Sequence, residues 1–174
     1  METFFEILKF TIPGLVVFAT AYFLLKMFLE DRQTMHQQQL RSESLKITLP
    51  IRLQAYERLT LLCERASIQN TLLRIRMPEM TVASLRGALL LAISQEFEHN
   101  TSQQVYVSNT LWQIISIARD ETLGIIAQAS DGLDPQDVDD RLVEKLLSVI
   151  DLQGNTDPLH QALIAIRKEA GQLF

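Results

Sequence analysis

Cysteine and glycine are scarce in this sequence, and neither is arranged as a chemical site requires. The chain has a single cysteine, Cys63, so no disulfide can form within it. Its six glycines are scattered along 174 residues, which excludes a glycine-rich loop for binding phosphate groups. Cys63 lies in an apolar helical stretch with no histidine nearby, which favours a small core residue over a nucleophile. The sequence therefore offers no catalytic motif and no cofactor-binding motif.

Spacings typical of metal ligands occur, but each is incomplete. Glu96 and His99 have the i, i+3 spacing of a carboxylate-bridged di-iron site, which needs a second such pair and two further glutamates. Asp157 and His160 alone approach a second pair. The acidic residues of 131–140 lack the pattern of a calcium loop, and favourable charge at a helix start explains them. We predict no catalytic, cofactor-binding or metal-binding residue; the alternative is a metal-dependent or other enzyme whose site these dispersed residues assemble.

Charge is missing from one long stretch near the start of the chain. Residues 10–25 contain no charged side chain and are framed by Lys9 and Lys26. The apolar character continues past Lys26, so that residues 10–29 reach the roughly 20 residues that cross a bilayer. Both lysines can extend their ammonium groups to the lipid headgroups. We predict a transmembrane helix at 10–29, preceded by a short extracytoplasmic tail at 1–9.

Small residues lie within this predicted span. Pro13 and Gly14 fall where a proline is tolerated, in the first turns of a helix. Gly14 and Ala21 allow close approach of a second helix in lipid, so the span is either an interaction surface or only an anchor. Two other interpretations are a cleaved signal peptide, which the acidic start of the chain disfavours, and a buried helix of a soluble domain, which would show a polar face.

Lysine and arginine close to the span predict its orientation. Lys9 stands alone on the N-terminal side, whereas Lys26, Arg32, Arg41 and Lys46 follow within about 20 residues. Because such residues are retained on the cytoplasmic side, we expect a single-pass protein of the inner (cytoplasmic) membrane. Its N-terminus would lie outside and its C-terminal domain in the cytoplasm.

The net charge of −5 hides an asymmetry along the chain. Residues 1–86 hold eleven Lys and Arg against eight Asp and Glu, and residues 87–174 hold five against thirteen. The half that contains the span is therefore basic, as expected beside anionic lipid. The other half is acidic, which disfavours binding to nucleic acid.

Beyond the span, the pattern predicts an all-α protein. Residues 30–48 are polar and form either a helical stalk or a linker, and Pro50 is expected to end that helix. Residues 49–174 then form a cytoplasmic bundle of about five helices. The first helix is predicted at 51–77. The second follows an N-cap at Thr81. Its apolar face is a candidate interaction or core face and consists of Leu85, Leu89, Leu90, Ile93 and Phe97.

The remaining three helices are predicted from local signals. The third begins between Ser102 and Ser108 and ends near Ser130. Asp134-Pro135 and Asp157-Pro158 each place a capping aspartate before a proline, which predicts the starts of the fourth and fifth helices.

The stretch LPIRLQAYERLTLLCER, residues 49–65, follows a single apolar N-terminal span. In this arrangement the chain resembles a group of small uncharacterised bacterial membrane proteins that share a domain of unknown function. That resemblance implies no activity. The sequence predicts a non-catalytic accessory or scaffold subunit that docks on a larger membrane complex or on itself, with no small-molecule substrate identified.

Overall fold

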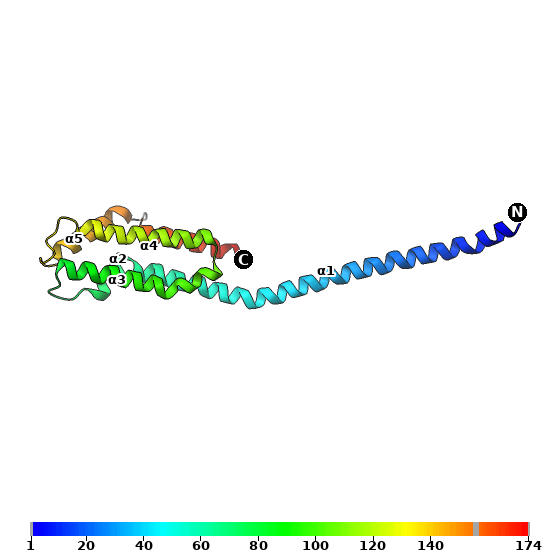
Figure 1. Ribbon diagram of the computed structural model, residues 1–174, viewed down its shortest axis with the longest axis horizontal. Coiled ribbons are helices and arrows are strands. Elements are labelled where there is room, and N and C mark those ends of the chain that lie inside the picture. The colour runs from blue at the N-terminus through cyan, green and yellow to red at the C-terminus, as the bar shows by residue number, and fades with distance from the viewer. Residues whose placement is uncertain (1, 155–156, 174) are drawn as a thin grey trace. The chain divides into compact units, whose positions relative to one another are not determined.

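The computed structural model describes the backbone of residues 2–154 and 157–173, and in these ranges all regular secondary structure is helical apart from one isolated pair of bridged residues (Figure 1). Within these ranges the side chains of 2–13, 30–31, 33–34, 36–42, 44–45 and 153 lie outside the description. The predicted all-α class is confirmed. Contacts divide the chain into two units, Met1–Thr48 and Leu49–Phe174.

All described residues of the first unit belong to helix α1 (Glu2–Ala66). Residues 30–48, for which stalk and linker were alternatives, are helical. The described residues contain no helix with an apolar stretch long enough to cross a membrane. Part of the predicted span at 10–29, and the whole of the predicted tail at 1–9, lie outside the described side chains.

The predicted helix break at Pro50 is wrong, because α1 continues through this residue to Ala66. A proline inside a helix removes one backbone hydrogen bond and costs about 3 kcal/mol. The turns that follow bury Ala55, Tyr56 and Leu59 in the core of the second unit. Burial of large apolar side chains at about 1.5–3 kcal/mol each offsets that cost.

The predicted single helix at 51–77 is interrupted at Ser67. Helix α1 ends at Ala66 and α2 spans Ile68–Ile75. The Ser67 hydroxyl accepts a hydrogen bond from the Asn70 amide at 3.4 Å and donates one to the Glu64 carbonyl at 2.8 Å. Serine therefore caps the new helix and bonds the end of the old one.

The predictions for the next two helices are confirmed. Helix α3 spans Val82–Asn100, and the Thr81 hydroxyl caps it by accepting from the Ser84 amide at 3.2 Å. A 3₁₀ helix, η1 (Thr101–Tyr106), leads to α4 (Asn109–Ser130), which Ser108 caps. Helix α4 therefore starts at the C-terminal end of the predicted range, 102–108.

The two aspartate–proline signals have different outcomes. Asp157 caps α6 (Pro158–Ala170), accepting from the His160 amide at 3.0 Å, as predicted. Asp134 does not cap a helix: its side chain accepts from the Gln136 amide in a loop. Helix α5 (Asp140–Gln153) begins later, and a final 3₁₀ helix, η3 (Gly171–Leu173), follows α6.

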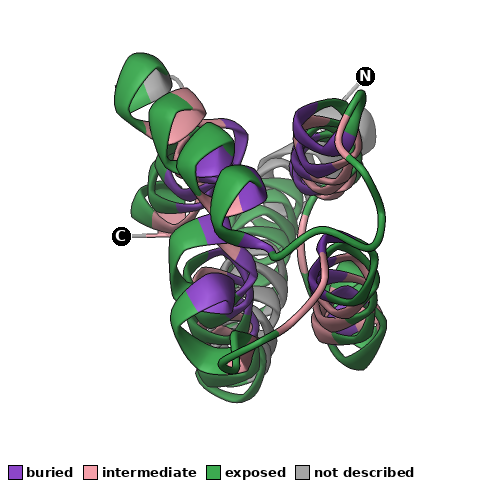
Figure 2. Ribbon diagram, turned by 90° about the vertical axis from the view of Figure 1, so that its left-hand side faces the viewer, coloured by how far each residue is buried: buried purple, intermediate pink, exposed green. Residues whose placement is uncertain are grey.

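The second unit encloses one apolar core, with α4 packed against α3 and α6. Figure 2 shows the buried positions facing inward between the helices. Its largest fully buried side chains come from every α-helix of this unit except α2: Leu59, Leu62, Leu85, Leu89, Ile93, Leu111, Ile115, Ile126, Leu142, Leu146, Leu159 and Ile166.

Candidate functional site

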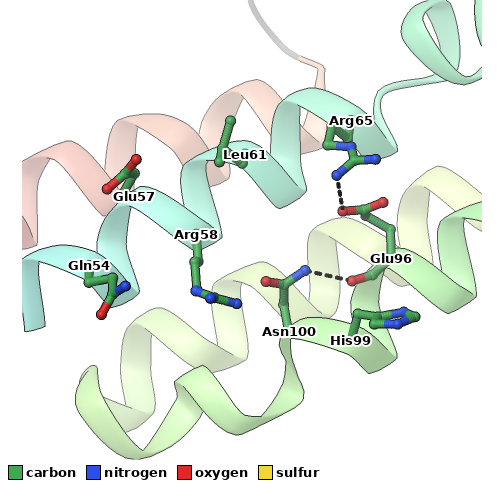
Figure 3. Close-up of a pocket in the computed structure, with 8 residues that line it drawn as sticks. All are labelled: Gln54, Glu57, Arg58, Leu61, Arg65, Glu96, His99 and Asn100. Atoms are coloured by element: carbon green, nitrogen blue, oxygen red, sulfur yellow. Dashed lines mark hydrogen bonds and ion pairs between the residues drawn. The ribbon is translucent and has the colours of Figure 1, made fainter. Parts of the chain in front are cut away.

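A cleft of about 520 Å³ lies in the second unit between the C-terminal part of α1 and the end of α3 (Figure 3). Most of its lining side chains are polar or charged, in contrast to the core beside it. The lining consists of Gln54, Glu57, Arg58, Leu61, Arg65, Glu96, His99 and Asn100.

The α1 wall of this cleft follows from helical periodicity. Gln54, Arg58, Leu61 and Arg65 recur at intervals of four and three residues, so they lie along one face of the helix. The intervening residues that face the core are buried: Ala55, Tyr56, Leu59, Leu62, Cys63 and Ala66. One helix thus presents an apolar face to the core and a mostly polar face to the cleft.

The last turn of α3 supplies the opposite wall. Asn100 is buried and donates from its side-chain amide to the Glu96 carbonyl at 2.8 Å. His99 is exposed, and its Nδ1 lies 3.1 Å from the Gln95 carbonyl of the preceding turn. Among the described residues, neither the His99 nor the Asn100 side chain makes a hydrogen bond to a titratable side chain.

Glu96 carries the negative charge at the centre of this wall. Its carboxylate lies 3.6 Å from the Arg65 guanidinium and 4.0 Å from that of Arg74, and its side chain is only 16% exposed. Two cations therefore surround one carboxylate. Because both arginines are partly solvated, each ion pair contributes modestly, on the order of 1 kcal/mol or less.

Arg58 differs from the other two arginines. Within the described part of the chain, it makes no hydrogen bond or ion pair. In Figure 3 its side chain extends from α1 toward Asn100 of α3, whereas the Glu57 carboxylate points away from it. Among the described residues, the Arg58 guanidinium is thus a cleft cation without an internal ion pair.

The structure places the four residues of the enzyme alternative in different surroundings. Glu96 and His99 line the cleft, whereas Asp157 and His160 lie at the start of α6 and are not part of the lining. In the described residues, no group of three or more His, Cys, Asp or Glu side chains is arranged to hold a metal ion.

The candidate face of α3 lies inside the fold. Leu85, Leu89, Ile93 and Phe97 are buried in the core, and Leu90 is half-buried against it. These side chains are therefore occupied by contacts within the chain. Of the five span and flank residues, Gly14, Ala21 and Lys26 are exposed on α1, and Lys9 and Pro13 lie outside the described side chains.

Cys63 is enclosed by the core. Burial, followed by the charges of Glu64 and Asp157, raises the pKa of its thiol to about 12. The reactive thiolate is therefore almost absent at neutral pH.

A polar network that the sequence did not reveal joins three distant segments. Tyr56 of α1 donates to Glu169 of α6 at 3.0 Å and accepts from Arg52 at 2.9 Å. Glu169 also accepts from the backbone amide of Ser108 at 2.9 Å and from its hydroxyl. Arg52 in turn donates to the Tyr106 carbonyl at 3.1 Å. Arg52 and Tyr56 are one helical turn apart, but the members of the other pairs are separated by more than fifty residues, so no local signal in the sequence predicts those contacts.

The network shifts two pKa values in opposite directions. Burial and the Glu169 carboxylate raise the pKa of Tyr56, and the guanidinium of Arg52 only partly compensates. Burial alone would raise the pKa of Glu169. The hydrogen bonds from Ser108 and Tyr56, with the charge of Arg52, outweigh burial and lower it. Tyr56 is therefore a neutral donor and Glu169 a charged acceptor, which is a structural arrangement.

Residues 2–173 match the family of unknown function DUF7935, and the chain belongs to this family. No curated protein and no solved structure matches it.

Proposed function

For this member of a family of unknown function, we propose a non-catalytic, membrane-anchored role. The N-terminal part of α1 inserts in the bilayer, and the helical unit from Leu49 docks as an accessory or scaffold subunit on a larger membrane complex or on a second copy. The proposal includes the bacterial inner membrane as its location and the cytoplasm as the side of the helical unit.

The observation that carries the proposal is the exposure of large apolar side chains around α1. Leu15 is 66% exposed, Phe18 71% and Phe23 67%. Their neighbours on all sides of the helix are similarly uncovered: Val16, Val17, Tyr22, Leu24, Leu25, Met27, Phe28 and Leu29. A helix that is apolar all round is stable in lipid or against protein.

The free energy of transfer from water favours lipid around the exposed apolar side chains of α1. Each large side chain transferred out of water contributes about 1.5–3 kcal/mol, so this stretch strongly favours an apolar surrounding. The sequence extends the uncharged stretch back to Phe10, which gives the roughly 20 residues that a bilayer needs. At its C-terminal end, the Arg32 guanidinium lies 5.1 Å from the centre of the Phe28 ring, a pairing that suits the headgroup layer.

The docking half of the proposal is supported by the chemistry of the cleft. The described residues of its lining include no serine, threonine, cysteine or lysine that would act as a nucleophile, and the histidine among them is exposed. Polar side chains around one exposed leucine, Leu61, are typical of a recognition surface.

Charged substitutions in the exposed stretch test the anchor. In Val17→Asp combined with Phe23→Asp, each aspartate costs about 2.5–3.5 kcal/mol at the centre of a span. We expect the wild-type protein to stay in the membrane pellet after alkaline carbonate extraction and to be released by detergent. The double variant is expected in the carbonate supernatant.

A matched control uses two equally exposed apolar residues of α1 outside the span, Met35→Asp combined with Ile47→Asp. This variant carries the same added charge and should stay in the pellet. Release of the wild-type protein by carbonate, or equal release of both double variants, would show that 10–29 is not a membrane anchor.

A further inference from the structure

Arg58 and Glu57 are exposed residues of the α1–α3 cleft, and the Glu57 carboxylate points away from the Arg58 guanidinium (Figure 3). Glu96 is already shared by Arg65 and Arg74, whereas Arg58 has no internal counter-charge among the described residues. Arg58 lies in the lining beside the amides of Gln54 and Asn100, and Figure 3 shows its guanidinium reaching into the space between the helices. This position suits an anion supplied from outside the chain.

We propose that the cleft binds a glutamate or aspartate side chain of an acidic segment of a partner protein, with Arg58 as the binding group. This inference rests on the docking half of the proposed function and names the chemistry of the partner. A guanidinium pairs with a carboxylate through two parallel hydrogen bonds, which fix the orientation of the bound side chain.

The lining favours a carboxylate over a phosphate. A carboxylate has one negative charge, which matches the one guanidinium that is not already paired. A phosphate carries up to two negative charges, which the Glu96 carboxylate would repel. Arg65 and Arg74, the cations nearest to Glu96, are already paired with that carboxylate.

The lining also favours a peptide over a small acid. Leu61 is 51% exposed beside Arg58 and offers an apolar contact to a neighbouring side chain of the same segment. The volume of about 520 Å³ is much larger than one carboxylate group. Recognition sites of this kind combine an apolar contact with a few oriented polar groups.

Binding of a defined acidic peptide tests the inference. The probe is a fluorescein-labelled peptide of repeated Glu-Glu-Leu-Leu units, measured by fluorescence anisotropy with the full-length protein in detergent. We expect saturable binding, and none of the matching Gln-Gln-Leu-Leu peptide. Arg58→Gln should weaken binding about tenfold, which is the effect of losing one well-oriented charged contact.

Two further variants separate this site from general charge attraction. Arg86→Gln removes the same charge from an exposed position of α3 outside the lining and should leave binding unchanged. Glu96→Gln removes the competing carboxylate, frees Arg65 and Arg74, and should tighten binding. Equal losses in Arg58→Gln and Arg86→Gln would refute the site.

Competition distinguishes the sources of the anion. Acetate should displace the peptide at lower concentration than inorganic phosphate; the reverse order would overturn the carboxylate assignment. Carbonate extraction of the Arg58→Gln variant tests membrane anchoring independently of peptide binding. If the variant stays in the membrane pellet while the wild-type protein fails to bind the peptide, the inference fails and the anchor stands.

Discussion

Glu169 illustrates how one residue couples distant segments. It accepts hydrogen bonds from Tyr56 and Ser108 and so connects α6 to α1 and to the start of α4. Its pKa lies below the ordinary value of 4.5, because the hydrogen bonds from Ser108 and Tyr56 and the charge of Arg52 outweigh the effect of burial. A carboxyl whose pKa is lowered on folding stabilises the fold while it is ionised.

The sign of this shift gives a pH prediction. The stabilisation is present above pH 4.5 and is lost as the pH falls through the lower pKa of the folded state. We expect Glu169→Gln to lower the free energy of unfolding at pH 7. The difference from the wild-type protein should shrink as the pH falls below 4.5, measured by urea unfolding followed by circular dichroism.

Glu98→Gln serves as the control for this substitution. Glu98 is exposed and has no side-chain partner among the described residues, so the variant should match the wild-type protein at each pH. A gap between Glu169→Gln and the wild-type protein that stays constant down to acid pH would show that the Glu169 charge does not contribute.

At the scale of elements, the loop before α5 is held by contacts that are remote in sequence. The Val82 amide donates to the Asp137 carbonyl at 2.9 Å, and the Asp139 amide donates to the Met80 carbonyl at 3.1 Å. The Asp139 carboxylate is buried and accepts two hydrogen bonds from Arg76, both at 2.8 Å. Arg76 also bonds Asp140 at 2.6 Å, so one guanidinium attaches the start of α5 to the end of α2.

Removing that guanidinium should loosen the attachment. In Arg76→Gln the Asp139 carboxylate, whose side chain is 2% exposed, loses its counter-charge while still buried. Because Arg76 itself is partly exposed, we expect a loss of about 2–3 kcal/mol in the free energy of unfolding, below the range for fully buried pairs. Hydrogen exchange should also quicken at the Val82 and Asp139 amides.

Arg74→Gln is the matched control, because Arg74 lies only two residues away and is 4.0 Å from a carboxylate that Arg65 also contacts. This change should cost less than about 0.5 kcal/mol. Similar losses in the two variants would mean that the Asp139 pair does not hold the loop.

The same loop shows why sequence predicted some element boundaries and not others. Asp157-Pro158 and Thr81 cap helices as predicted, because a cap involves only neighbouring residues. Asp134-Pro135 carries the same local signal, but the Pro135 carbonyl accepts from the Ala83 amide, and this tertiary pairing keeps the segment out of the helix. Similarly, the helix continues through Pro50 because of core contacts that follow it.

The candidate site was predictable only in part for a related reason. The i, i+3 spacing singled out Glu96 and His99 only as an incomplete metal-ligand pair of the enzyme alternative, and not as part of a cleft. Arg58 and Arg65 lie on α1, more than thirty residues before Glu96 in the sequence. No periodic pattern in the sequence predicts which face of α1 packs beside α3. Pairing of the two faces depends on how the core residues of α1 and α3 pack.

At the scale of the whole molecule, the second unit contains its own core. The α1 residues from Leu49 onward bury Ala55, Tyr56, Leu59, Leu62, Cys63 and Ala66 against the later helices. Residues 49–174 therefore include every buried apolar side chain of the described chain, and their length is typical of an independent domain.

We accordingly expect the fragment 49–174 to fold on its own, with a helical circular dichroism spectrum and a single cooperative transition in urea. A shorter fragment, 67–174, provides the test of the argument, because it lacks the α1 residues that complete the core. Losing Leu59 and Leu62 alone removes two fully buried side chains, at about 2–5 kcal/mol each. The shorter fragment should therefore show no cooperative transition. If 49–174 is coil-like, its fold requires residues 1–48 or a partner; if 67–174 unfolds as cooperatively as 49–174, the C-terminal part of α1 is not an essential part of the core.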